Sequence, residues 1–354
     1  MKTTDNLRIT RLKALIAPGL LLEQLPLDEK TAEHIERSRQ ITTDIIHGND
    51  DRLIVIVGPC SIHDATAAVE YARRLEKIVQ NYSKDLFIIM RVYFEKPRTQ
   101  VGWKGLINDP HLDESFDINY GLNCARNLLL SINRLGIPTG SEFLDNIIPQ
   151  YISDLTTWAA IGARTVESQI HRELASGLSM PVGFKNSTTG NIQVAVDAVM
   201  AAASPHHFLG VSKQGLAAII STTGNKDCHV ILRGSSQGPN YDATSIDNAS
   251  DLLAKANVSN PLMVDMSHGN SNKDFRRQKI VAQSLCEQIA GGSTKIMGVM
   301  FESNLVEGKQ DLIDKKELLY GQSITDACVG WDESIEILNL LAEAVRKRRQ
   351  EINK

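Results

Sequence analysis

Short apolar runs alternate with amphipathic stretches along most of the chain. The first run, LIVIV at residues 53–57, precedes a stretch in which Asp64 can cap a helix and Ala67, Tyr71 and Leu75 recur at helical spacing. Further apolar runs lie at 86–94, 137–145, 159–165, 181–186, 229–234, 262–268 and 295–303. Strands that alternate with helices in this way predict an α/β fold, a (β/α)8 TIM barrel. A doubly wound parallel sheet fits the same alternation, because periodicity does not show whether a sheet closes.

Two segments stand outside this alternation. The first is an N-terminal arm, residues 1–48, in which 29–47 is predicted to be helical. The second is 206–222, where two short apolar runs flank a Lys-Gln-Gly turn, as in an antiparallel β-hairpin. The predicted organisation is therefore an arm at 1–48 and a barrel at 49–354 that carries an inserted hairpin.

Composition excludes several classes of function. The 354 residues are 42% hydrophobic and 23% charged, which permits a large core, and no apolar run reaches the length of a membrane span. The net charge of -4 argues against nucleic acid or an anionic membrane as the main partner, and RKRRQ at 346–350 more simply complements the dipole of a final helix. Widely spaced cysteines and the lack of a signal peptide lead us to expect a cytoplasmic protein.

Each predicted strand delivers a polar, mostly charged residue at its C-terminal end. In chain order these residues are Cys60, Arg91, Glu142, Arg164, Lys185, Arg233, His268 and Glu302. In a barrel, the carboxyl ends of all strands meet at one mouth, where such enzymes keep their chemistry. The sequence therefore predicts one site that contains all of these side chains.

The first group in this predicted site is cationic. Arg91, Arg164, Lys185 and Arg233, together with Lys96 and Arg98, would crowd positive charge into one concave site. Crowded cations repel one another unless an anion offsets them, so the group predicts a substrate that carries phosphate or carboxylate. Neutralisation by carboxylates from the same mouth is the alternative.

The second group combines soft and hard metal donors. Cys60, His268 and Glu302, joined by Asp326, offer a thiolate, an imidazole and carboxylates, a set that suits manganese, iron, cobalt, zinc or copper ions. A nucleophilic cysteine–histidine pair is the competing interpretation, and it leaves both carboxylates without a role.

Several segments resemble one family of enzymes. GPCSIHD, RVYFEKPRT, GWKGLINDPH, IGART, VDMSHGNSNKDFRRQ and SITDACVGW occur in the order found in bacterial 3-deoxy-D-arabino-heptulosonate 7-phosphate (DAHP) synthases of the feedback-regulated short type, and the resemblance covers nearly the whole chain. It implies a (β/α)8 barrel that condenses phosphoenolpyruvate with D-erythrose 4-phosphate and water, releases phosphate and opens the shikimate pathway. It also implies a divalent metal ion, with Mn2+ favoured.

The resemblance implies roles for individual residues. The metal ligands would be Cys60, His268, Glu302 and Asp326, with Asp326 also beside the substrate. Phosphoenolpyruvate would contact Arg91, Lys96, Arg164, Lys185 and Arg233, with Glu142 nearby, and erythrose 4-phosphate would contact Lys96, Arg98 and Thr99. Lys96, Cys60 and His268 are the expected catalytic residues, and both Lys96 and a water on the metal are candidates for the proton donor.

The arm and the hairpin resemble the effector-binding additions of this family. In relatives, glycine at the position of Gly210 accompanies inhibition by tyrosine and serine accompanies phenylalanine, so we expect tyrosine, with phenylalanine next. Asp5, Pro149, Gln150 and Ser179 are further candidates for the effector site. The family implies a homodimer or homotetramer.

Two other functions fit parts of the residue pattern. A related synthase uses arabinose 5-phosphate, and a barrel without activity could serve as an aromatic amino acid sensor.

Three segments depart from the sequence pattern of the family. They lie beside the predicted site, at Gln100, 186–190 and 233–241.

Overall fold

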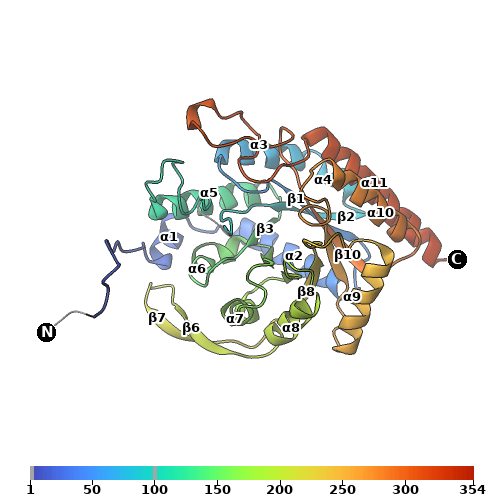
Figure 1. Cartoon of the computed structure of the whole chain (residues 1–354), viewed down its shortest axis with the longest axis horizontal. Coiled ribbons are helices and arrows are strands. Elements are labelled where there is room, and N and C mark those ends of the chain that lie inside the picture. Colours follow the sequence, from blue (N-terminus) through green and yellow to red (C-terminus); the bar gives the residue numbers. More distant parts are fainter. Residues whose placement is uncertain (1–3, 99–101) are drawn as a thin grey trace.

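The chain folds as a closed barrel of parallel strands. A computed structural model describes residues 4–98 and 102–354 (Figure 1). Neighbouring strands pair in parallel all around the ring, and β1 pairs with β10 to close it. In ring order from β1 the strands are β1 (Leu53–Gly58), β10 (Ile296–Glu302), β9 (Leu262–Asp265), β8 (Cys228–Leu232), β5 (Val182–Lys185), β4 (Trp158–Ile161), β3 (Thr139–Glu142) and β2 (Leu86–Arg91). The (β/α)8 prediction is confirmed and the doubly wound alternative is wrong.

Helices surround the barrel. Asp64 caps α3 (Ala65–Glu76), the helix that follows β1, as predicted. Its carboxylate accepts hydrogen bonds from the backbone N–H groups of Thr66 and Ala67. The helices are α1 (Pro18–Gln24), α2 (Glu29–Ile46), α3 (Ala65–Glu76), α4 (Val79–Tyr82), α5 (Ile118–Arg134), α6 (Pro149–Ile152), α7 (Gln169–Gly177), α8 (Gln193–Ala202), α9 (Ala243–Lys255), α10 (Arg277–Ala290) and α11 (Trp331–Ile352). Short 3-10 turns lie at Ser153–Leu155 and Lys315–Glu317. In the described part of the chain, no helix is both long and apolar enough to cross a membrane.

Side chains fill the barrel interior, so the interior is a packed core. A buried cluster joins inward-facing residues of the strands to Ile45 and Ile46 of α2, which places α2 against one end of the barrel. Within this cluster the Trp158 indole N–H donates to His229 Nε2 at 2.9 Å, and burial lowers the pKa of His229 to about 4. With one end covered and the interior filled, the carboxyl ends of the strands are where the fold leaves room for a site.

The predicted hairpin at 206–222 is confirmed. Its strands β6 (His207–Val211) and β7 (Ala217–Ser221) pair in antiparallel fashion outside the barrel. The turn between them contacts the arm, because the backbone N–H of Gly19 donates to the carbonyl of Lys213, and it contacts α6, because Lys213 Nζ donates to the carbonyl of Gln150. Figure 1 shows the hairpin beside α1 and α6. The domain boundary at residue 48 stays a prediction.

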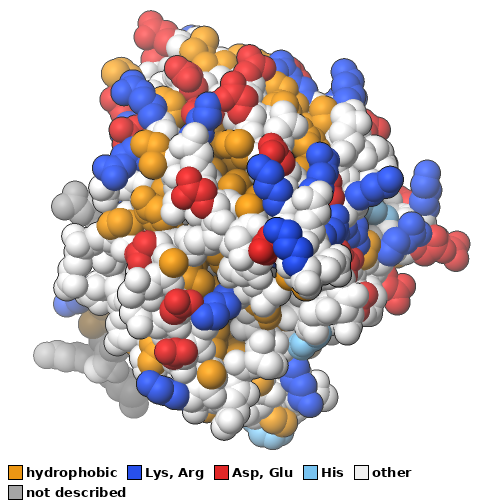
Figure 2. Space-filling view, turned by 90° about the vertical axis from the view of Figure 1, so that its right-hand side faces the viewer, with side chains coloured by type: hydrophobic (Ala, Val, Ile, Leu, Met, Phe, Trp, Pro, Cys, Tyr) orange, Lys and Arg blue, Asp and Glu red, His pale blue; other side chains and the backbone are white. Residues whose placement is uncertain are grey.

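The basic segment 346–350 does more than complement a helix dipole. Arg346 Nε and Arg349 Nη1 pair with the buried Asp85 carboxylate at 2.7 and 2.6 Å, and Arg349 also binds Asp51. Asp51 and Asp85 precede β1 and β2, so these pairs tie α11 to the amino end of the barrel. On the face shown in Figure 2, Lys and Arg side chains are interspersed with Asp and Glu side chains.

Candidate active site

The predicted strand-end residues converge on one cavity. This cavity has a volume of about 970 Å3 and opens at the carboxyl ends of the strands. Among the residues that line it are Arg91, Lys96, Arg98, Glu142, Arg164, Lys185, Arg233, His268 and Asp326. Cys60 and Glu302 lie directly behind this lining, because Lys96 Nζ is 2.9 Å from Cys60 Sγ and Arg91 Nη2 is 3.1 Å from Glu302 Oε1. Thr99 lies outside the described residues.

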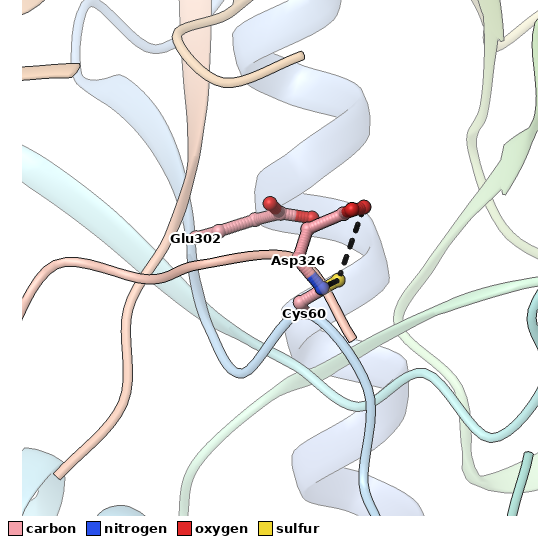
Figure 3. A group of neighbouring side chains, drawn as sticks. All are labelled: Cys60, Glu302 and Asp326. Carbon is pink, nitrogen blue, oxygen red and sulfur yellow. Dashed lines mark hydrogen bonds between the residues drawn. The ribbon is translucent and has the colours of Figure 1, made fainter. Parts of the chain in front are cut away.

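Cys60, Glu302 and Asp326 form a compact donor group. One ligand atom from each residue lies within 4.8 Å of the others, and Figure 3 shows the three side chains directed toward one another. Cys60 Sγ lies 3.6 Å from Asp326 Oδ2 and 3.4 Å from the Asp326 backbone nitrogen.

The turn after β1 aims Cys60 at this group. Gly58 has a φ of +150°, and a Cβ there would meet the Arg91 carbonyl oxygen at 2.8 Å, so the position requires glycine. The next carbonyl, that of Pro59, accepts from Arg91 Nε at 3.1 Å. The GPC segment therefore lets β1 and β2 approach closely at the point where the thiol enters the site.

The electrostatics of the group suit a cation. Burial raises the pKa of Cys60 to about 12, and the nearby Glu302 carboxylate adds to that effect, while Lys96 opposes it. A divalent ion would reverse this preference, because it favours the thiolate form of a coordinating cysteine. A thiol and two carboxylates with closely spaced donor atoms therefore fit a divalent transition ion.

His268 lies at the edge of this group. Its Nε2 atom is 3.7 Å from Glu302 Oε1, and its Nδ1 atom is 2.9 Å from Asp265 Oδ2. Its φ of +54° is in the left-handed region, which is uncommon for a residue other than glycine and recurs at functional sites. Within the described residues, the polar contacts of Cys60 Sγ are with Lys96 and Asp326, so a hydrogen-bonded Cys60–His268 nucleophilic pair is not formed.

Two of the six cations are paired with buried carboxylates. Arg91 binds Glu302, and its guanidinium lies over the Tyr93 ring at 3.6 Å from the centroid, while Lys185 Nζ is 2.8 Å from Asp265 Oδ2. Among the described residues, no carboxylate lies within ion-pair distance of Arg98, Arg164 or Arg233. The alternative of internal neutralisation therefore accounts for only part of the cationic group, and unpaired guanidinium groups remain to bind an anion.

Sequence analysis missed Asp265 and Asn186. Asp265 ends β9 and is completely buried; burial alone would raise its pKa, but Lys185 and His268 hold that pKa well below its ordinary value. Asn186 follows β5, and its side-chain oxygen accepts from the backbone N–H of Arg233 at 2.8 Å. Asp265 lies inside the predicted run 262–268, at the point where its apolar residues first give way to a charged one, and that signal could have found it.

The effector candidates are only partly brought together. Pro149 and Gln150 begin α6, which contacts the hairpin through Lys213 and through Asn146, whose Nδ2 donates to the Leu209 carbonyl at 3.1 Å. Gly210 is buried in β6, and a Cβ on it would overlap Ile220 Cδ1. Ser179 lies in the exposed loop between α7 and β5, and Asp5 is exposed on the arm, where its carboxylate bonds to Asn6. These contacts bring α6, which carries Pro149 and Gln150, to the hairpin that carries Gly210.

The comparisons with known proteins agree on one family. A sequence profile described as the DAHP synthetase I family matches residues 26–339. The chain is 55% identical over 345 residues to a protein of Escherichia coli named "Phospho-2-dehydro-3-deoxyheptonate aldolase, Phe-sensitive". The matched residues cover 98% of each chain. It is 54% identical over 346 residues to the phospho-2-dehydro-3-deoxyheptonate aldolase of Haemophilus influenzae, with 98% of this chain and 96% of the relative covered.

The same agreement holds for the fold. The solved structure of phospho-2-dehydro-3-deoxyheptonate aldolase from Francisella tularensis superposes with a TM-score of 0.95 at 54% identity, covering 96% of this chain and 99% of that one. The profile, the near full-length identities and the superposition together lead to one conclusion: the chain belongs to the DAHP synthetase I family.

Proposed function

We propose that this protein is a metal-dependent DAHP synthase. It would join phosphoenolpyruvate, D-erythrose 4-phosphate and water to give 3-deoxy-D-arabino-heptulosonate 7-phosphate and inorganic phosphate, the first step of the shikimate pathway. The observation that carries the proposal is the convergence of the cationic group and the Cys60–Glu302–Asp326 donor group on one cavity at the barrel mouth. We expect the protein to act in the cytoplasm.

Cys60, His268, Glu302 and Asp326 are the residues that would hold the metal ion. When bound, the ion supplies Lewis acidity that polarises an aldehyde carbonyl. Mn2+ is the favoured ion, and Fe2+, Co2+, Zn2+ and Cu2+ suit the same donors.

The cationic residues bind and orient two substrates that repel each other. Arg164, Lys185 and Arg233 lie at the ends of β4, β5 and β8, where they can bind the phosphate and carboxylate of phosphoenolpyruvate together with Arg91. Arg98 lines the same cavity, and its Nε donates to the Trp103 carbonyl at 2.8 Å, which fixes the side chain for the phosphate of erythrose 4-phosphate. Holding both anions in one geometry converts an unfavourable encounter into a positioned reaction.

The chemistry then follows from the substrates. The C2=C3 π electrons of phosphoenolpyruvate form the bond from C3 to the aldehyde carbon, and the aldehyde C=O π bond breaks as its oxygen takes a proton to become a hydroxyl group. Water adds to the electron-poor C2 and loses one proton. The C2–O bond to phosphate then breaks, and the second proton of the former water is lost as the C2 ketone forms and phosphate leaves. Lys96 Nζ, with 9% of its side chain exposed and 2.9 Å from Cys60 Sγ, is the candidate within the chain for the proton donor to the aldehyde oxygen.

Sugar phosphate specificity tests this proposal. Wild-type protein with Mn2+ and phosphoenolpyruvate is given erythrose 4-phosphate or arabinose 5-phosphate, and phosphate release and the heptulosonate product are measured. Release with erythrose 4-phosphate alone is expected. Release with arabinose 5-phosphate alone would identify the related synthase, and no release with either sugar would favour an amino acid sensor.

An aromatic amino acid is the proposed inhibitor, with tyrosine favoured and phenylalanine next. The α6–hairpin–arm contact, which joins Gln150, Lys213 and Gly19, supports a binding site remote from the cavity. The name of the Phe-sensitive relative supports phenylalanine instead. Inhibition by each aromatic amino acid at equal concentration distinguishes the two.

The arm and the hairpin also support a proposal for assembly as a homodimer or homotetramer. Leu7, Leu12, Leu209 and Ile219 are more than 70% exposed on these two segments, at 73%, 82%, 79% and 78%. Exposed apolar side chains that gather on one surface mark a place where another chain binds, and we propose that the arm and the hairpin form such a surface. Sedimentation velocity measures the state directly, and a monomer at micromolar concentration contradicts the proposal.

A further inference from the structure

Asp265 is a buried carboxylate that contacts both functional groups of the site and is not itself one of the proposed metal ligands. It ends β9, has no exposed surface, and lies between Lys185 of the cationic group and His268 of the metal-binding group. Neither the sequence patterns nor the reaction described above gives it a role.

All of the acceptor positions of Asp265 are used. Oδ2 accepts from Lys185 Nζ at 2.8 Å and lies 2.9 Å from His268 Nδ1. Oδ1 accepts from the backbone N–H of Ser267 at 2.9 Å and from its hydroxyl at 2.5 Å. Such a carboxylate is fixed in orientation, so the groups bound to Oδ2 are fixed with it.

The first consequence concerns the tautomer of His268. Nδ1 lies 2.9 Å from Asp265 Oδ2 and 3.1 Å from the Ser267 hydroxyl oxygen, whose own hydrogen is donated to Asp265 Oδ1. Both neighbours of Nδ1 therefore act as acceptors, which places the proton of a neutral imidazole on Nδ1 and its lone pair on Nε2. Nε2 is the atom that faces Glu302 at 3.7 Å. Asp265 therefore presents the ligating nitrogen of His268 toward the Cys60–Glu302–Asp326 group, from a backbone with a φ of +54°.

The second consequence concerns Lys185. Its side chain is 5% exposed in a cavity wall that also contains Arg91, Arg164 and Arg233. Lys185 Nζ donates to Asp265 Oδ2 at 2.8 Å, and a charge-assisted hydrogen bond of this kind holds the flexible lysine side chain in one position. Asp265 therefore fixes Lys185 where it can bind an anionic substrate.

We propose that Asp265 is a positioning residue that orients His268 toward the metal ion and Lys185 toward phosphoenolpyruvate, and so couples the two binding functions. The inference rests on the proposed function. Carboxylates that hold a ligating histidine from behind affect metal affinity by about 10- to 100-fold in other proteins.

The test compares Asp265→Asn with the wild type. The amide has nearly the same shape but carries no charge, and its NH2 group cannot accept from Lys185 or from His268. We expect Mn2+ to bind about 10- to 100-fold more weakly in a titration without substrate. We also expect the KM for phosphoenolpyruvate at saturating Mn2+ to rise by about 10-fold or more, with a smaller change in kcat. The visible absorption of bound Co2+ should shift, because the orientation of one ligand changes.

Asp85→Asn is the matched control. Asp85 is also a buried carboxylate with two cationic partners, but it lies at the opposite end of the barrel. It should lower the thermal unfolding temperature while leaving the Mn2+ dissociation constant and the KM unchanged. If Asp265→Asn does not fold, Ser267→Ala replaces it. Loss of the hydroxyl removes one bond to Asp265 Oδ1 and the 3.1 Å contact with His268 Nδ1, so a smaller loss of Mn2+ affinity in the same direction is expected.

The outcomes separate the two proposals. If the wild type binds Mn2+ and Asp265→Asn, or its replacement Ser267→Ala, binds it equally well with an unchanged KM, Asp265 is only structural and the inference is wrong. If the wild type itself binds no divalent ion, the proposed metal-dependent function fails, whatever the variants do.

Discussion

Replacing Cys60 by serine removes the soft donor of the proposed metal site with little change in shape. The side chain is completely buried, and Lys96 Nζ at 2.9 Å can donate to a hydroxyl as it does to the thiol. The metal-free fold should therefore survive, with a change in the free energy of unfolding of about 1 kcal/mol, the net worth of one hydrogen bond. The metal should be held much less tightly, because a thiolate is replaced by a neutral hydroxyl.

The size of that loss can be bounded. Loss of a residue that hydrogen-bonds a metal ligand lowers metal affinity by about 10- to 100-fold in other proteins. Removal of the ligand itself should therefore lower metal affinity by more than about 100-fold. We expect this loss in a Mn2+ titration of Cys60→Ser, and a matching loss of phosphate release at micromolar Mn2+. Partial recovery at millimolar Mn2+ should follow from mass action.

Cys228→Ser is the control for this variant. Cys228 is equally buried, but it begins β8 at the amino end of the barrel, away from the cavity. This variant should be less stable than wild type but should bind Mn2+ normally. If Cys60→Ser kept full activity and wild-type Mn2+ affinity, the assignment of Cys60 as a ligand would be refuted.

Other expected outcomes concern regulation, stability and oxidation. Gly210→Ser should shift inhibition from tyrosine toward phenylalanine by about 10-fold or more in the ratio of inhibition constants, because a side chain there displaces Ile220; an unchanged ratio contradicts this steric account. Asp85→Asn should lower the free energy of unfolding by about 1–3 kcal/mol in a denaturant titration, since it weakens bonds to Arg346 and Arg349; a shift below about 0.5 kcal/mol would show that these pairs contribute little. Peroxide should release metal and abolish activity by oxidising the Cys60 thiolate, as measured by metal content and thiol titration; retention of both after thiol oxidation would contradict it.

Local patterns predicted the barrel well because each strand and helix carries its own period. The run 53–57 became β1 with one added residue, Gly58, and Asp64 caps α3 as its position before an apolar period indicates. The predicted runs 137–145 and 262–268 are longer than β3 and β9, because the apolar and functional residues continue into loops after pairing ends. Closure could not be predicted, since it depends on the pairing of β1 with β10, in which Ile54 lies opposite Gly298, far away in the sequence.

The site was predicted as a set of residue types, but not as a set of contacts. Cys60, Glu302 and Asp326 proved to be neighbours, whereas Asp265 was missed because the run 262–268 predicts one strand that delivers His268, but β9 ends at Asp265. The Asp265 carboxylate can be buried because it is paired with Lys185 on β5, which lies 80 residues earlier in the chain. The segment 346–350 shows the same limit, since the Asp85 partner of Arg346 is 261 residues away.

Dependence of phosphate release on both substrates and on metal tests the central claim most directly. Wild-type protein is depleted of metal with EDTA, and phosphate is measured with phosphoenolpyruvate alone, with both substrates, and with both substrates after Mn2+ is restored. The account predicts release only in the last case. Equal release by the metal-depleted protein, or release without erythrose 4-phosphate, would contradict it.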